Sequence, residues 1–237
     1  MKTILFLLAG AVLSYLIGCL NSSIIISHIL KKDDVRNSGS GNAGATNMVR
    51  TYGKFYGVLS FALDFIKVVI AYLIISLIFS RLDPVGFETY KYFFKVITGF
   101  FCFIGHIYPC FFGFRGGKGI TVCAAVVCIL DWRLFIIGTL LFFAVVFITK
   151  YISFSSILFA FVYPVCTFFL FDKTLTFIPL SLTAKNTFGA EEPKLRIAAL
   201  IIAIVFSIII LLKHRDNIKR LLKGEENKIG SHKKAAD

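Results

Sequence analysis

The hydrophobic residues of this chain fall into seven long runs, and each run is bounded by charged residues or by glycine and proline. Apolar runs near the length of a bilayer-spanning helix, roughly 20 residues, are typical of membrane proteins. The runs cover residues 4–30, 55–80, 92–112, 120–130, 134–149, 154–171 and 197–212. The pattern predicts an all-α integral membrane protein with seven transmembrane helices.

The fourth run, residues 120–130, is short for a helix that crosses a bilayer. Three arrangements would accommodate it. The helix extends back through Gly117, the protein is thin at this place, or the segment enters only half of the membrane. One short or partly re-entrant helix is therefore part of the predicted fold.

Composition excludes a water-soluble domain, and charge orients the chain. It is 57% hydrophobic with a mean hydropathy of +0.83, and so apolar a surface requires hydrocarbon as its solvent. Well over half of the Lys and Arg residues fall on one side of the predicted spans, in residues 31–54, 113–119, 150–153 and the tail from Lys213. By the positive-inside rule this side is cytoplasmic, which places the N-terminus outside and the C-terminus inside.

We expect a single seven-helix domain over residues 1–212, with motif loops at 31–54, 113–119 and 150–156. A basic cytoplasmic extension over residues 213–237 follows, and its start contributes to the site. The net charge of +13 would also suit a nucleic-acid binder, but the basic residues are scattered over loops and form no recognisable binding module. We expect anionic lipid headgroups and phosphorylated small molecules as partners, without nucleic acid, obligate protein partner, metal or cofactor.

The six cysteines lie in or beside the apolar runs and include no CxxC pair, so we expect packing roles for them. Residues 16–19 resemble a bacterial lipoprotein cleavage box. Hydrophobic residues continue beyond this box as far as Ile29, which favours an uncleaved first helix. The long segment 172–196 has no assigned role.

The first glycine-rich loop, residues 39–47, combines small residues with hydrogen-bond donors. Small residues allow several backbone N–H groups to converge on one anion. The side chains expected to bind substrate are those of Ser40, Asn42, Thr46 and Asn47. Arg50, one helical turn further on, can add a bidentate contact. A flexible polar loop without a ligand is the alternative for this composition.

The second glycine-rich loop, residues 113–119, has the sequence GFRGGKG and presents Lys118. It differs from a nucleotide-binding P-loop, because the first glycine is missing and Gly119 follows the lysine where Ser or Thr is required. We expect Gly116, Gly117 and Gly119 to form a turn at the start of the fourth helix. There the helix dipole and free N–H groups favour an anion.

Two further polar clusters lie on the predicted cytoplasmic side. Residues 150–156 place three hydroxyls at a helix start, which taken alone is an ordinary N-cap. His214 and Asn217 open the tail, and their three-residue spacing puts them on one side of a helix. The alternative for the tail is a solvated basic flank of a membrane helix.

Ionisable residues also occur within or beside the apolar runs. Asp64 and Lys67 are three residues apart, so they can neutralise each other while facing the bundle interior. A structural ion pair is the default interpretation. His106 precedes a proline break at residues 105–109, where a satisfied interfacial histidine is more common than a base.

Two formal motif matches do not fit their context. Gly39, Gly41 and Gly44 match GxGxxG, but no strand precedes them, which excludes a dinucleotide site. His28 and Asp33 match the HxxxxD dyad of glycerolipid acyltransferases, in which His deprotonates the acceptor hydroxyl. A chain of this composition also produces such a short pattern by chance.

Taken together, residues 39–54, 105–119, 150–157 and 213–226 resemble the motifs of the bacterial acyl-phosphate:glycerol-3-phosphate acyltransferase family, in the same order. The resemblance covers the chain from the first run to the tail. It implies a seven-helix enzyme of the bacterial cytoplasmic (inner) membrane that acts in phospholipid biosynthesis. Such an enzyme moves a fatty acyl group from acyl phosphate to the sn-1 hydroxyl of glycerol 3-phosphate, releasing lysophosphatidic acid and orthophosphate. Neither acyl-CoA nor acyl carrier protein is its donor.

The resemblance also assigns residues of all four motifs to the substrate site. They are Ser40, Arg50, Lys118, Ser156, His214 and Asn217, with Ser153 as a neighbouring candidate. The catalytic residues expected on this basis are Lys118, Arg50, His214 and Asn217. The glycines of the second loop would bind a phosphate through their backbone N–H groups.

Acyl phosphate already carries a good leaving group, so positioning its carbonyl beside the acceptor hydroxyl could supply roughly 7 kcal/mol or more. We therefore expect a substrate phosphate oxygen, rather than His214, to accept the hydroxyl proton while Lys118 and Arg50 stabilise charge. The main alternative is a membrane transporter for a phosphorylated metabolite. It requires charges near the bilayer midplane and an internal repeat, and the sequence contains no repeat that we detect. A non-catalytic lipid-binding protein would not need four phosphate-binding clusters.

Overall fold

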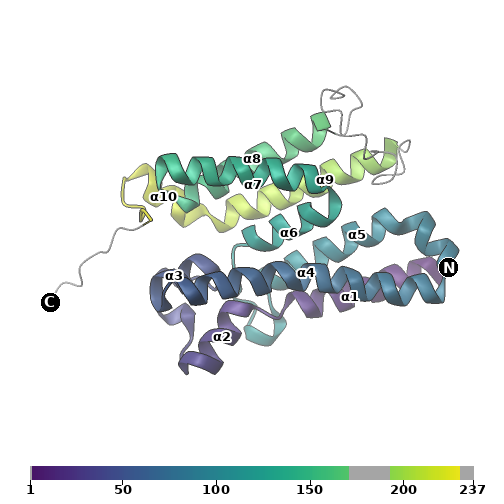
Figure 1. The fold of residues 1–237 in the computed structure, drawn as a ribbon, viewed down its shortest axis with the longest axis horizontal. Coiled ribbons are helices and arrows are strands. Elements are labelled where there is room, and N and C mark those ends of the chain that lie inside the picture. The colour runs from purple at the N-terminus through teal and green to yellow at the C-terminus, as the bar shows by residue number, and fades with distance from the viewer. Residues whose placement is uncertain (1, 171–192, 230–237) are drawn as a thin grey trace.

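The computed structural model describes residues 2–170 and 193–229, and within them every regular element is a helix. The α-helices are α1 (Lys2–Gly18), α2 (Ser22–Lys31), α3 (Ala45–Tyr52), α4 (Lys54–Leu82), α5 (Pro84–Ile107), α6 (Ile120–Leu130), α7 (Trp132–Thr149), α8 (Ile152–Leu170), α9 (Pro193–Lys213) and α10 (Arg215–Leu222). Two 3₁₀ helices, η1 (Val35–Asn37) and η2 (Cys110–Phe112), lie in the loops. Figure 1 shows most helices running along the long axis, with α2, α3 and α10 at the end opposite the N-terminus.

Five helical segments of the described chain are long and apolar enough to cross a membrane, and a sixth results if α9 and α10 count as one bent pair. The five segments are Lys2–Lys31, Lys54–Leu82, Pro84–Phe112, Trp132–Thr149 and Ile152–Phe169. Because these segments coincide with predicted apolar runs, the helical membrane architecture follows from hydropathy alone.

The short helix that the sequence predicts is α6, which has 11 residues. At 1.5 Å per residue it is about 16 Å long, roughly half the thickness of the hydrocarbon core. It begins directly after Gly119, so the extension back through Gly117 does not occur. Figure 1 shows α6 between a layer of α1, α4 and α5 and a layer of α7, α8 and α9, and it contacts α4, α5 and α7. A helix too short to cross the bilayer is tolerated here because protein surrounds it.

The first apolar run forms one candidate span, Lys2–Lys31, but residues 19–21 divide it into α1 and α2. Asn21 has an extended backbone, and its side chain accepts a hydrogen bond from the Ile24 N–H as the N-cap of α2. An Asn at this position starts a new helix inside an apolar run. α1 itself ends tightly packed against α5, since a Cβ added at Gly18 would lie 2.4 Å from the Cys102 carbonyl oxygen.

Candidate active site

The first loop is shaped by the buried amide of Asn47, the third residue of α3. Asn47 Nδ2 donates to the carbonyl oxygens of Val35 and Ser38, both at 2.9 Å, and Asn47 Oδ1 accepts from the Ser40 N–H at 2.8 Å. These three bonds occupy the amide with backbone groups. Asn47 therefore holds the loop in place, a role that differs from the predicted direct contact with substrate.

The other polar side chains of the first loop are more accessible. Ser40, Thr46 and Arg50 are exposed, while α3 turns Met48 into the protein interior. Asn42 is half-buried, and its Nδ2 lies 2.9 Å from the position that a Cβ added at Gly44 would occupy. A hydroxyl and a guanidinium on one loop and the helix that follows it are suitable donors for a phosphate.

The second loop packs inward through two of its glycines. The Gly116 N–H donates to the Ile107 carbonyl at 3.1 Å and the Gly117 N–H to the His106 carbonyl at 3.2 Å. These two N–H groups therefore do not point at a ligand, which corrects the expectation that they bind phosphate. Gly119, with φ of +86°, is the N-cap residue of α6, and within the described residues no side chain caps this helix.

Lys118 follows the packed glycines and reaches the C-terminal segment. Lys118 Nζ donates to Asn217 Oδ1, and Asn217 Nδ2 donates to Glu226 Oε1 at 2.9 Å. The second carboxylate oxygen of Glu226 accepts from Arg220 Nε at 2.7 Å. Two segments that are 99 positions apart in sequence thus meet in one hydrogen-bonded chain.

The charge of Lys118 is sensitive to its surroundings. Burial, the largest cause, lowers the pKa of Lys118 to about 8, together with the positive charges of Arg220 and Arg50. The carboxylates of Glu226 and Asp216 oppose this shift. Lys118 is therefore mostly protonated at neutral pH and loses its proton in mildly alkaline solution.

His214 lies at the bend of 59° between α9 and α10 and is buried. His214 Nδ1 is 2.8 Å from the Ile210 carbonyl oxygen, and because a carbonyl only accepts, Nδ1 carries the hydrogen. Burial, assisted by the nearby charge of Lys118, lowers the pKa of His214 to about 4. His214 is thus neutral at pH 7 and a weak base.

Ser153 and Ser156 lie near the start of α8, and both are buried. Ser156 Oγ donates to the Ile152 carbonyl at 2.9 Å. Ser153 Oγ is buried without a hydrogen-bond partner among the residues that the structure describes. An unpaired buried hydroxyl is costly, so Ser153 is the serine of this cluster that most needs a ligand.

The C-terminal segment folds back onto this cluster. The Ile229 N–H donates to the Lys150 carbonyl at 2.9 Å, and Lys228 Nζ lies 5.5 Å from the ring centre of Tyr151. α10 also contacts α8. Residues 150–156 therefore lie against the C-terminal segment, as the second loop does.

Arg36 connects the two loops. Arg36 Nη1 donates to the carbonyl oxygens of Phe112 at 2.7 Å and Arg115 at 3.1 Å, and the guanidinium is held by the Asp34 carboxylate. Neither Arg36 nor Glu226 was singled out from the sequence. Their signals were weak: Arg36 is one of many loop cations, and Glu226 is one of two adjacent acids in a basic tail.

The structure therefore brings the four polar clusters to one end of the molecule, where Figure 1 shows α3 and α10. The HxxxxD pair, in contrast, does not form. His28 Nε2 lies 3.4 Å from Asp34 Oδ2, while Asp33 Oδ2 accepts from the Tyr52 hydroxyl at 2.6 Å. The predicted buried ion pair is confirmed, with Lys67 Nζ 2.7 Å from Asp64 Oδ1.

Helices of this length and hydropathy, with loops that carry basic and hydroxyl side chains in contact with one another, define a multi-pass membrane protein with a candidate phosphate-binding site. A family model described as glycerol-3-phosphate acyltransferase matches residues 8–224. The chain belongs to this family, and it is therefore an acyltransferase. The identification made from the four motifs is confirmed, and the transporter alternative is set aside.

Relatives match over nearly the whole chain. A glycerol-3-phosphate acyltransferase of Finegoldia magna is 34% identical over 229 residues, which are 96% of this chain and 98% of the relative. The enzyme of Mycoplasmopsis agalactiae is 34% identical over 235 residues, with 98% and 97% covered. The crystal structure of PlsY, an integral membrane glycerol 3-phosphate acyltransferase, in its glycerol 3-phosphate form is 33% identical, with a TM-score of 0.72 over 94% of this chain and 96% of that chain. This match confirms the all-helical integral membrane fold.

Proposed function

We propose that the protein transfers a fatty acyl group from acyl phosphate to the sn-1 hydroxyl of glycerol 3-phosphate. The hydroxyl oxygen forms a bond to the acyl carbon, the bond from that carbon to the phosphate oxygen breaks, and the hydroxyl proton passes to phosphate. The products are lysophosphatidic acid and orthophosphate. Two solved relatives, one in a glycerol 3-phosphate form and one in a lysophosphatidic acid form, support the acceptor and the product.

The contact between Lys118 and Asn217 carries this proposal. It joins the second loop to the C-terminal segment. It also places the Lys118 ammonium close enough to Arg50 and Arg220 for their positive charges to lower its pKa. Two phosphate-bearing substrates require two anion sites close together, and cations fixed in advance stabilise the charge that develops during transfer. Ser40 on the first loop and Ser153 at the start of α8 would add hydroxyl donors.

The proton acceptor in the proposed mechanism is a phosphate oxygen of the substrates. His214 is a poor general base, because its pKa of about 4 lies far below neutral pH. Its Nε2 can instead accept a hydrogen bond from a bound hydroxyl and orient it. Positioning the two substrates next to each other then supplies most of the rate acceleration. The effective molarities of well-oriented reactants are large enough for this.

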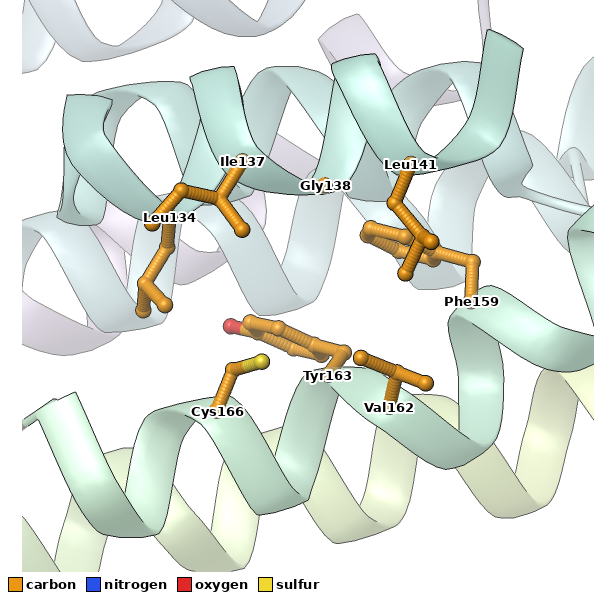
Figure 2. A pocket seen from close by; sticks show the side chains of 8 residues that line it. All are labelled: Leu134, Ile137, Gly138, Leu141, Phe159, Val162, Tyr163 and Cys166. Atoms are coloured by element: carbon orange, nitrogen blue, oxygen red, sulfur yellow. The ribbon is translucent and has the colours of Figure 1, made fainter. Parts of the chain in front are cut away.

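An apolar pocket of about 10 Å³ lies between α7 and α8, which is room for one water molecule and not for an acyl chain. Figure 2 shows the side chains around it, which belong to Leu134, Ile137, Gly138, Leu141, Phe159, Val162, Tyr163 and Cys166. Ser156, Phe159 and Tyr163 follow one another at spacings of three and four residues, so they share one face of α8. The acyl chain would follow this face toward lipid only after α7 and α8 move apart, because Ser156 and Tyr163 are buried and the pocket is too small to hold it.

The topology belongs to the same proposal. Seven helices, α6 among them as the short one, place the N-terminus outside and the site at the cytoplasmic side of the bacterial inner membrane. Residues 1–212 form the membrane domain and residues 213–237 the basic extension. The gathering of α3 and α10, with their basic residues, at one end supports this orientation. The segment 171–192 lies outside the described residues.

The test uses purified full-length protein in detergent with palmitoyl phosphate and glycerol 3-phosphate, and it measures orthophosphate release. We expect Lys118→Ala to lower kcat/KM by about 10² to 10³, since it removes a cation from the site of transfer. Arg115→Ala is the matched control, because its exposed side chain removes an equal charge from the same loop. Equal use of palmitoyl-CoA as donor, or an unchanged rate in Lys118→Ala, would contradict the proposal.

A further inference from the structure

A charged cluster of three side chains lies beneath the two loops and takes no part in the mechanism above. It consists of Asp64 and Lys67 on α4 and His106 on α5, which are 2%, 7% and 3% exposed. Lys67 Nζ lies 2.7 Å from Asp64 Oδ1 and 3.2 Å from His106 Nδ1. Charges inside a membrane protein are costly, so their presence calls for a function.

On one side the cluster binds the break between α1 and α2. Lys67 Nζ donates to the carbonyl oxygens of Gly18 at 3.1 Å and Leu20 at 2.9 Å. Asp64 Oδ1 accepts from the Ser22 N–H at 3.2 Å. A helix break exposes backbone groups that water cannot reach within a membrane, and here the charged cluster provides their partners.

The break in turn holds the first loop. Asn21 is fully buried, and its Nδ2 donates to the Ala43 carbonyl in the first loop at 3.2 Å. Asn21 Oδ1 is already used as the cap of α2. Any shift of residues 19–21 relative to α4 would therefore move the first loop.

On its other side the cluster holds the second loop. The His106 carbonyl accepts from the Gly117 N–H, and a Cβ added at Gly117 would lie 2.3 Å from His106 Nε2. The same Cβ would lie 2.8 Å from the Ala43 carbonyl oxygen. Gly117 thus touches the charged cluster and the first loop at once, and the next residue is Lys118.

We propose that Asp64, Lys67 and His106 are positioning residues that fix the first loop against the second loop, so that the two substrates meet at reacting distance. This inference rests on the proposed function. The cluster contacts Gly117 and is separate from the side chains proposed to bind substrate. If each loop binds one substrate, transfer depends on the placement of the loops relative to each other, and a displacement of about 1 Å can cost about 10²-fold in rate.

The test is Lys67→Met, which keeps the length of the side chain and removes its charge. We expect kcat for acyl transfer to fall about 100-fold while KM for each substrate changes by less than about threefold. The matched control is Lys95→Met on α5, because Lys95 is a half-buried lysine of a spanning helix that lies near Tyr72 and outside the charged cluster. We expect this control to keep the kcat of the unmodified protein.

A merely structural role would lower Tm and leave the kcat of the folded protein unchanged. Rates are therefore measured well below each variant's Tm and normalised to monodisperse protein. The double variant Asp64→Asn with Lys67→Met removes both charges, so it folds better than the single variant, yet we expect its kcat to stay low. His106→Asn, which keeps a polar group at the Nδ1 position, should retain more kcat than His106→Leu.

An unchanged kcat in the folded double variant overturns the positioning role. The same conclusion follows if KM for both substrates rises while kcat is kept, because the cluster would then serve binding. If the unmodified protein and Lys95→Met release no orthophosphate, the proposed function fails, and this inference fails with it.

Discussion

Glycine has different tasks in the two loops. In the first loop Gly41 provides backbone conformation alone, since it has φ of +69° and a Cβ there would meet no atom closer than 3.5 Å. Gly39, with φ of +61°, provides conformation and also leaves room for Asn47 Oδ1. In the second loop Gly116 and Gly117 provide space. A Cβ added at Gly116 would lie 1.9 Å from the His106 carbonyl oxygen, and one at Gly117 would lie 2.3 Å from His106 Nε2.

The two loops also differ in how exposed their cationic side chains are. The first loop leads to Arg50, whose guanidinium is exposed. The second loop presents Lys118, partly buried, with a pKa lowered to about 8. An exposed cation on the first loop therefore faces a partly buried one on the second, and we expect the second loop to tolerate change less.

The largest effect expected from this comparison is that of Gly117→Ala. The added methyl group would overlap His106 Nε2 and approach the Ala43 carbonyl, so both loops must shift. We expect kcat/KM for acyl transfer to fall about 100-fold, measured as orthophosphate release.

Gly113→Ala is the control for Gly117→Ala. Gly113 has φ of +65°, but no atom lies within 4 Å of a Cβ added there. The substitution costs backbone strain alone, of order 1 kcal/mol. Equal losses in the two variants would show that conformation, not space, is what glycine provides in the second loop.

The sequence predicted which residue types gather at the site but not where each side chain points. The resemblance to the family motifs predicted Lys118 and Asn217 as site residues, and the structure brings them into contact. Asn47 has the same donors as any ligand-binding amide, yet it is occupied by backbone carbonyls. Such orientation depends on contacts with residues far along the chain, which composition and spacing do not contain.

The fold shows the same limit. Apolar run length predicted the membrane helices and the short α6, because the bilayer sets the length of a spanning helix. The break after Gly18 was missed, since Asn21 and Ser22 stand inside a strongly apolar run. What sustains the break is Lys67, 47 positions from Leu20 in sequence, whose ammonium binds the exposed carbonyls.

The next effect in size is a dependence on pH that only the second loop should show. With a lowered pKa of about 8, Lys118 is protonated below pH 8 and loses its charge above it. Between pH 7 and pH 9 the protonated fraction falls about tenfold, and we expect kcat/KM to fall with it. The phosphate groups of the substrates do not titrate between pH 7 and pH 9, because their second pKa lies near 6.

Lys118→Arg separates this effect from a general loss at alkaline pH. A guanidinium keeps its charge at pH 9, so the residual activity of the variant should be flat between pH 7 and pH 9. An alkaline decline that persists in Lys118→Arg would assign the titration to another group.

The smallest effect expected is that of Gly41→Ala in the first loop. Its φ of +69° disfavours a Cβ, but the nearest atom, the Arg36 carbonyl oxygen, would be 3.5 Å away. Only conformational strain remains, of about 1–2 kcal/mol, which would lower Tm by a few degrees. Because the side chains of Ser40 and Arg50 are exposed, we expect kcat/KM to change less than about threefold. We expect Gly41→Asn to recover most of the lost Tm, because asparagine tolerates a positive φ. A loss as large as that of Gly117→Ala would mean that the first loop is as rigidly placed as the second.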